Sequence, residues 1–214
     1  MDFLFNYIIE NTIRIYRLFK SKWKIKSYIP LKVKLGKGVI VGKKTFFSTY
    51  LNEIGDHTFI HTGSRIEMVE RIGKYCSISH GVKLGLGPHP KDYFSTSPVF
   101  YSLYRGKVHK ALFDEIAHSG LTVVENDVLI SSNACIVAGV TLSTGCIVGA
   151  GAIVTKDVPP YAIVTGIPAK IISYRFDEET RAKLLESKWW DMPLNDLLKI
   201  NPQNFDDLIY KNNE

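Results

Sequence analysis

Six histidines offer the most versatile chemistry in this chain, because an imidazole titrates near neutral pH and can act as a general base. They are His57, His61, His80, His89, His109 and His118. His89 stands between Pro88 and Pro90 in the segment GLGPHPKDYFSTSPVFY, where the two prolines restrict the backbone on either side. This restriction suits a base that must be held in place, and Asp92 is close enough in sequence to orient it or to stabilise its charge.

Other catalytic signatures are missing from the sequence. It contains no G-x-S-x-G elbow, no P-loop, no G-x-G-x-x-G after a strand and no H-E-x-x-H, which disfavours serine nucleophiles, nucleotide sites and metalloproteases. His57 and His61 form only a weak metal pair. The three cysteines, Cys76, Cys135 and Cys146, have no C-x-x-C spacing, so the sequence predicts neither a disulfide framework nor a zinc knuckle and fits a reducing cytoplasm.

The elements that must position His89 are indicated by a repeat of six residues. Aliphatic residues recur at Ile54, Ile60, Ile66, Ile72, Ile78 and Leu84, and again at Val124, Ile130, Ile136, Leu142, Val148 and Val154. The residue four positions further on is usually small or compact, as at Thr58 and Ser64. A period of six predicts a short strand and a corner per hexad, with three hexads closing a coil of about 18 residues, so that Ile54 stacks on Ile72.

The repeat also predicts where this prism of coils begins and ends. Leu35 and Val41 keep the period, but the step to Ile54 implies one residue inserted near Phe47, and we expect the prism to cover residues 31–174. Glycines directly follow three of the aliphatic residues, where a backbone corner favours a residue without Cβ: Gly55, Gly73 and Gly149.

Residues 85–121 interrupt the repeat, because the spacing from Leu84 to Val124 is not a multiple of six. A long insertion in a compact domain is usually functional. Its aromatic residues indicate a folded flap, and we expect the active site beside it; they are Tyr93, Phe94, Phe100, Tyr101 and Tyr104.

Both ends of the chain read as helical segments, residues 1–30 and 175–214, whose usual role is to cover the open ends of a solenoid. Asp177 can cap the first C-terminal helix, and Trp189 and Trp190 read as packing residues. The N-terminal segment is too polar to span a bilayer. Of the net charge of +6, residues 1–44 hold eleven Lys or Arg against two acidic residues, a local +9. The segment can therefore cap the prism or touch an anionic membrane surface.

The hexads, the flap HPKDYFSTSPVFY, the later VTKDVPPYAIVTGIPAKII and the tail KWWDMP together resemble the left-handed β-helix, hexapeptide-repeat acetyltransferases. The resemblance is to the branch of xenobiotic and polysaccharide O-acetyltransferases and covers residues from about 35 to 193. It implies an all-β fold, a left-handed parallel β-helix with an inserted flap and helical ends. It also implies a homotrimer, with acetyl-CoA as co-substrate bound between subunits and no required metal.

The same resemblance assigns site residues. His89 matches the flap histidine that removes the proton of the acceptor hydroxyl, with Asp92 beside it. Matching of motifs gives a set of coenzyme-binding residues: Ser132, Ala150, Thr155, Lys156 and Lys170. Leu129 stands where many relatives have a tryptophan, and Ser173 replaces a frequent second cation, so the coenzyme contacts differ in detail.

These observations predict a cytoplasmic, acetyl-CoA-dependent O-acetyltransferase, which can also lie at the inner face of the membrane. The expected acceptor is a saccharide of a surface polysaccharide or its precursor. One alternative is a xenobiotic acetyltransferase acting on chloramphenicol or a streptogramin. Alternatives from other classes are a zinc enzyme of the γ-carbonic-anhydrase kind, which needs three converging histidines, and a non-catalytic scaffold. Nucleic-acid binding is disfavoured, because the basic stretch lacks a reading motif.

Overall fold

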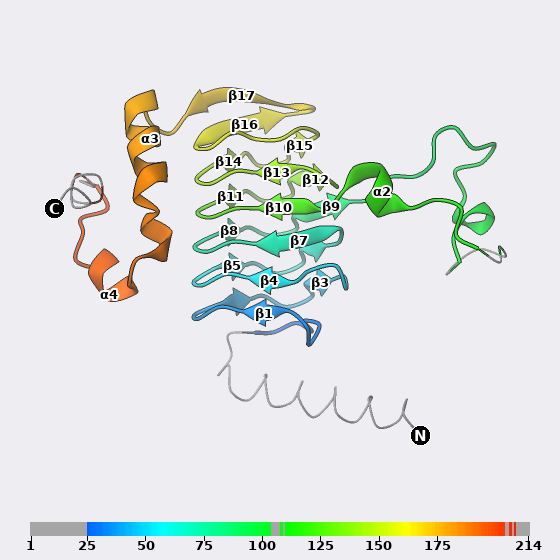
Figure 1. Cartoon of the computed structure of the whole chain (residues 1–214), viewed down its shortest axis with the longest axis horizontal. Coiled ribbons are helices and arrows are strands. Elements are labelled where there is room, and N and C mark those ends of the chain that lie inside the picture. Colours follow the sequence, from blue (N-terminus) through cyan, green and yellow to red (C-terminus); the bar gives the residue numbers. More distant parts are fainter. Residues whose placement is uncertain (1–24, 104–107, 109, 204–205, 207, 209–214) are drawn as a thin grey trace, which may run out of the picture.

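The protein is a three-sided prism of stacked coils with a flap on one side and C-terminal helices on the opposite side (Figure 1). This computed structural model describes residues 25–103, 108, 110–203, 206 and 208. Each side of the prism is a sheet in which each coil pairs its backbone in parallel with the coils above and below, and only the last strand of one sheet is antiparallel among the described strands. The predicted N-terminal helical stripe from Phe5 to Phe19 lies outside the described residues.

The three sheets are named here I, II and III in the order in which the chain visits them. Sheet I contains β1 (Lys34–Leu35), β4 (Glu53–Ile54), β7 (Val69–Ile72), β10 (Thr122–Val124) and β13 (Thr141–Leu142). Sheet II contains β2 (Ile40–Val41), β5 (Phe59–Ile60), β8 (Ser77–Ile78), β11 (Leu129–Ile130), β14 (Ile147–Val148), β16 (Ala162–Gly166) and the antiparallel β17 (Ala169–Tyr174). Sheet III contains β3 (Phe46–Phe47), β6 (Arg65–Ile66), β9 (Lys83–Leu86), β12 (Cys135–Val137) and β15 (Ile153–Val154).

The predicted aliphatic columns form the core of the prism. Ile54 pairs with Ile72, as the spacing predicts, and Ile60, Ile78 and Ile130 follow one another in sheet II. These side chains have no solvent exposure. The compact residues four positions further on are buried as well, including Thr58 and Ser64, so two positions of each hexad face inward.

The corners show a second regularity that the sequence analysis missed. The third residue after the aliphatic one has a positive φ at many corners, and this position holds glycine in some coils, as at Gly81, but His57, Tyr75, Asp127 and Tyr161 in others. Gly73 does not have a positive φ, so backbone conformation does not explain the glycine there, contrary to expectation. The glycine is explained by the close approach of the next coil, because a Cβ on Gly73 would lie 2.5 Å from the Glu125 carbonyl oxygen.

The prism departs from the simple repeat in three places. The register between Phe47 and Ile66 is 19 residues, whereas Ile66 and Leu84 are 18 apart, so the inserted residue lies in the first coil after Phe47. Val158 bridges Leu142 at a spacing of 16, because the corner before Pro159 is two residues shorter. Residues 25–30, assigned to the helical N-terminal segment, run instead beneath the first coil, where Ile25 bridges Val41.

The C-terminal segment covers the edge where sheets I and II meet (Figure 1). It contains α3 (Glu178–Ser187), η2 (Trp189–Asp191) and α4 (Leu194–Leu197). Asp177 caps α3 as predicted, since its carboxylate accepts a hydrogen bond from the Thr180 amide at 2.8 Å. Among the described residues, no helix has the length and apolar character needed to cross a membrane.

Burial separates the three thiols into two classes. Cys76 and Cys146 are buried in the prism. Burial raises the pKa of the Cys76 thiol to about 12, and it raises the pKa of the Cys146 thiol as well. Because the thiolate is the reactive form, we expect a thiol reagent to modify the partly exposed Cys135 in the folded protein and the other two only after unfolding. Cys135→Ser is then expected to abolish the native-state reaction. Rapid labelling of Cys76 before unfolding would contradict this assignment.

Candidate active site

His89 lies at the edge where sheets III and I meet, just beyond β9, where residues 87–121 leave the prism as the flap. This is two residues later than predicted, because Leu86 still belongs to the sheet and its carbonyl accepts a hydrogen bond from Ala138 N. The His89 side chain is exposed, whereas Pro90 beside it is buried. The anchored proline fixes the backbone at the base of the flap, and the imidazole faces solvent.

Two groups hold the His89 ring. Its Nδ1 lies 3.0 Å from the Thr96 carbonyl oxygen and 2.8 Å from Tyr101 Oη. The Thr96 carbonyl oxygen can only accept, so it is a hydrogen-bond partner in the tautomer with the proton on Nδ1; in the other tautomer the Tyr101 hydroxyl donates to Nδ1. The first tautomer has its lone pair on Nε2. In that tautomer Nε2 is the basic atom, which is the arrangement a general base needs.

Tyr101 connects His89 to the folded interior of the flap. Its ring contacts Tyr93 and Phe113, with centroids 6.3 and 5.7 Å away, and its side chain is almost fully buried. Burial, and to a smaller degree the charge of Glu115, raises the pKa of Tyr101, so the phenol stays protonated at neutral pH. The prediction of a folded aromatic flap is confirmed for these residues. Tyr104 and His109 lie outside the described residues.

The flap is also ordered by two short helices. In η1 (Pro98–Phe100) the Ser97 side chain accepts a hydrogen bond from Val99 N. In α2 (Glu115–Ser119) the Asp114 carboxylate accepts hydrogen bonds from the amides of Ile116 and Ala117 at 2.9 and 3.0 Å. These caps satisfy amides that a helix leaves without internal partners.

Asp92 is exposed and does not share in the hydrogen bonds of His89 Nδ1, which go to Thr96 and Tyr101. In this structure the His89 ring is therefore oriented by Thr96 and Tyr101, in the role expected for Asp92. Sequence reasoning missed the Thr96 carbonyl because a backbone oxygen has no residue-type signal, and it grouped Tyr101 only with the other aromatic residues of the flap.

The five predicted coenzyme residues fall on both edges of sheet III. Ser132 and Ala150 lie on the edge between sheets II and III in successive coils, where Gly151 N donates to Ser132 O at 2.9 Å. Lys170 follows at the top of that edge, in β17 opposite Thr165. Thr155 and Lys156 directly follow β15 and so lie on the same edge as His89, but further along the prism.

The other histidines that the structure describes do not converge. His61 and His80 are neighbours on the edge between sheets II and III, with ring centroids 5.9 Å apart, and His61 Nδ1 accepts a hydrogen bond from Thr62 N at 2.8 Å. His57 lies on a different edge, stacked on Tyr75. Within the described part of the chain, no group of three or more His, Cys, Asp or Glu side chains could hold a metal ion.

No family model matches the chain. A chloramphenicol acetyltransferase of Agrobacterium fabrum is 38% identical over 172 residues, which cover 77% of this chain and 80% of that protein. The chain belongs to the hexapeptide-repeat acetyltransferases, in their xenobiotic branch. A chloramphenicol acetyltransferase of Escherichia coli is 40% identical over 134 residues, which are 61% of this chain and 63% of that protein, so this chain spans less than two thirds of its length.

Solved structures show the same fold. A hexapeptide-repeat acetyltransferase of Vibrio cholerae, solved with acetyl-CoA, superimposes with a TM-score of 0.52 at 27% identity and covers 67% of this chain and 72% of that one. A Bacillus cereus N-acyltransferase reaches a TM-score of 0.57 at 19% identity, covering 77% and 86% of the two chains. The predicted fold class, a left-handed parallel β-helix of the hexapeptide-repeat acetyltransferases, is confirmed.

Proposed function

We propose that this family member transfers the acetyl group of acetyl-CoA to a hydroxyl of its acceptor, with His89 as general base. The observation that carries the proposal is the Nδ1 contact to the Thr96 carbonyl, because in the tautomer that makes this hydrogen bond Nε2 is free to take a proton. The acceptor oxygen attacks the thioester carbonyl as Nε2 removes the hydroxyl proton, and a tetrahedral oxyanion forms. When the carbon–sulfur bond breaks, the CoA thiolate leaves and the imidazolium returns the proton to it.

Acetyl-CoA is the proposed co-substrate, and the site is proposed to form between copies of the chain. Ser132 and Ala150 lie across sheet III from His89, so one prism presents the base on one edge and these residues on the other. In a homotrimer, the edge of one subunit that carries Ser132 and Ala150 would face the His89 edge of its neighbour. This arrangement would bring the base and the coenzyme-binding residues together. The sedimentation velocity of the purified protein tests this assembly.

The acceptor has two candidates. Chloramphenicol is favoured by the 38% identical relative, whose match covers 80% of that enzyme. A saccharide is favoured by the sequence of the flap, because HPKDYFSTSPVFY and the charged stretch that follows it to Ser119 resemble surface-polysaccharide enzymes. Thiol release from acetyl-CoA, measured with chloramphenicol, a streptogramin and sugar acceptors side by side, decides between them. The absence of turnover with all of these, combined with no acetyl-CoA binding, would favour a scaffold.

Two lysines are proposed to contact the coenzyme phosphates. Lys156→Ala and Lys170→Ala are each expected to raise the dissociation constant of acetyl-CoA about fivefold, because charge-assisted contacts at exposed sites contribute roughly 1 kcal/mol. Isothermal titration calorimetry measures the change, with Lys34→Ala in the first coil as the control of equal charge. If both variants bind like the parent protein, the coenzyme lies elsewhere.

The membrane contact proposed for the basic residues 1–30 falls mainly outside the described part of the chain. Because exposed charges are screened by salt, such a contact would appear as binding to anionic but not neutral vesicles that weakens as salt is added.

A further inference from the structure

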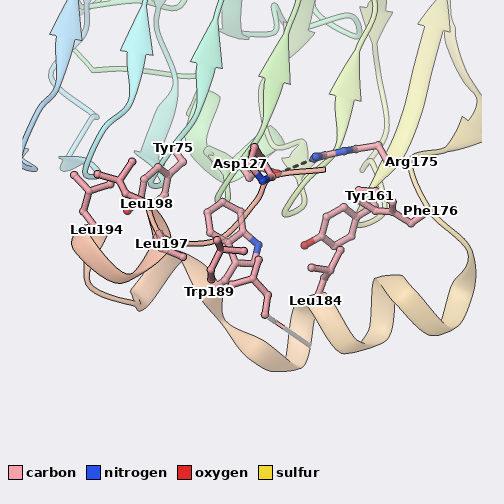
Figure 2. A pocket seen from close by; sticks show the side chains of 13 residues that line it. Tyr75, Asp127, Tyr161, Arg175, Phe176, Leu184, Trp189, Leu194, Leu197 and Leu198 are labelled. Carbon is pink, nitrogen blue, oxygen red and sulfur yellow. Dashed lines mark hydrogen bonds and ion pairs between the residues drawn. The ribbon is translucent and has the colours of Figure 1, made fainter. Parts of the chain in front are cut away.

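A cavity of about 360 Å³ lies far from His89, where the C-terminal segment covers the edge between sheets I and II (Figure 2). The prism contributes Tyr75, Asp127 and Tyr161 from three corners of this edge. The other wall is formed by the C-terminal segment, through Leu184 of α3, Trp189 of η2, and leucines that lie in α4 or follow it. The volume is in the range of small-molecule sites, and the lining combines many apolar side chains with few polar groups, as such sites do.

The charged groups of this cavity neutralise each other. Arg175 Nη1 donates to Asp127 Oδ2 at 2.7 Å and to the Gly145 carbonyl at 2.9 Å, and its guanidinium also lies over the Tyr161 and Phe176 rings. Burial raises the pKa of Asp127, while the Arg175 charge acts to lower it. The pair therefore offers no free charge to a ligand, and an anion would have to displace Asp127.

One polar group in the cavity is left over. Among the described residues, none forms a hydrogen bond with the buried Tyr161 hydroxyl, and only 1% of Tyr161 is exposed. The Trp189 indole is near enough to lower the pKa of the phenol somewhat, but the geometry between them does not make a hydrogen bond. Burial, the larger effect, raises this pKa, so the group is an O–H donor at neutral pH. Figure 2 shows its oxygen directed toward Trp189 and the interior of the cavity.

Packing of the C-terminal segment does not explain this hydroxyl. A phenylalanine would fill the same space without a buried unpaired donor, which costs free energy.

We infer that this cavity binds a neutral, planar aromatic molecule with a hydrogen-bond acceptor such as a carbonyl oxygen. The acceptor takes the Tyr161 proton, and the ring lies among Tyr75, Trp189 and the leucines. Because the cavity and the flap lie on opposite edges of sheet I, the site is separate from that of acetyl transfer and does not depend on it (Figure 1).

Two matched probes test the site, acetophenone and ethylbenzene, which differ in the carbonyl oxygen. Calorimetric titration of the full chain is expected to show about fivefold tighter binding of acetophenone, the ratio that one ordinary hydrogen bond provides. Tyr161→Phe should remove this preference and leave ethylbenzene unchanged. Leu197→Trp, which fills the cavity, should weaken both probes at least tenfold. Equal binding of the two probes by the parent protein, or a preference that survives Tyr161→Phe, overturns the proposal.

A stability measurement checks the unpaired hydroxyl independently. Without a ligand, Tyr161→Phe is expected to raise the melting temperature by about 2–4 °C, because it removes a buried donor without a partner. A lower melting temperature would show that the hydroxyl is already satisfied and would remove the argument for a ligand acceptor.

Discussion

Replacement of His89 by alanine is expected to lower kcat about 100-fold or more while the dissociation constant of acetyl-CoA stays unchanged. An alcohol is a weak nucleophile until a base removes its proton, and Nε2 is the free atom for this role in the His89 tautomer that donates from Nδ1 to the Thr96 carbonyl. The side chain is exposed at the prism edge, so its loss should not disturb the core. Thiol release with the identified acceptor gives kcat, and calorimetry gives coenzyme affinity.

Variants within the same flap provide the controls. His118→Ala removes an exposed imidazole of α2 and is expected to change kcat less than threefold. Asp92→Asn is expected to behave in the same way, because the hydrogen bonds of His89 go elsewhere. A kcat near that of the parent protein in His89→Ala would remove this residue from the mechanism. A large loss in Asp92→Asn would instead restore the orienting role that its position in the sequence suggests.

The architecture could be predicted from the sequence because burial in a prism repeats with the chain. Each coil must direct aliphatic side chains at the same axis, so Ile60, Ile78 and Ile130 share one period and one column. The position of His89 could be predicted for a related reason. Where the period fails, the chain leaves the prism, and His89 stands at the start of that interruption.

Other parts of the site could not be predicted because their partners are distant in sequence or belong to the backbone. The ion pair of Asp127 with Arg175 joins residues 48 apart, and that of Lys74 with Asp191 joins residues 117 apart. Arg175 and Asp191 both follow the last strand of the prism, so the hexads do not predict what they contact. Tyr161 could be interpreted only as one more aromatic residue, since the burial of its hydroxyl depends on the C-terminal segment that covers this edge of the prism.

The energetic importance of the columns can be tested at Ile78, which lies between Ile60 and Ile130 with no solvent exposure. Ile78→Ala is expected to lower the free energy of unfolding by about 3 kcal/mol, within the 2–5 kcal/mol range for buried aliphatic truncations. The loss includes the cavity left between two coils that pair through their backbones. Urea denaturation followed by circular dichroism measures it.

Ile40→Ala is the matched control, because Ile40 lies in the same sheet but points outward and is 38% exposed. It removes the same atoms from a half-solvated position, so it should cost less than about 1 kcal/mol. Since stability in a solenoid is a sum over coils and their contacts with neighbours, a central truncation weakens two contacts at once. An equal decrease in the free energy of unfolding in the two variants would show that the outward side chains of sheet II are also buried in solution. An interface between subunits would bury them in this way.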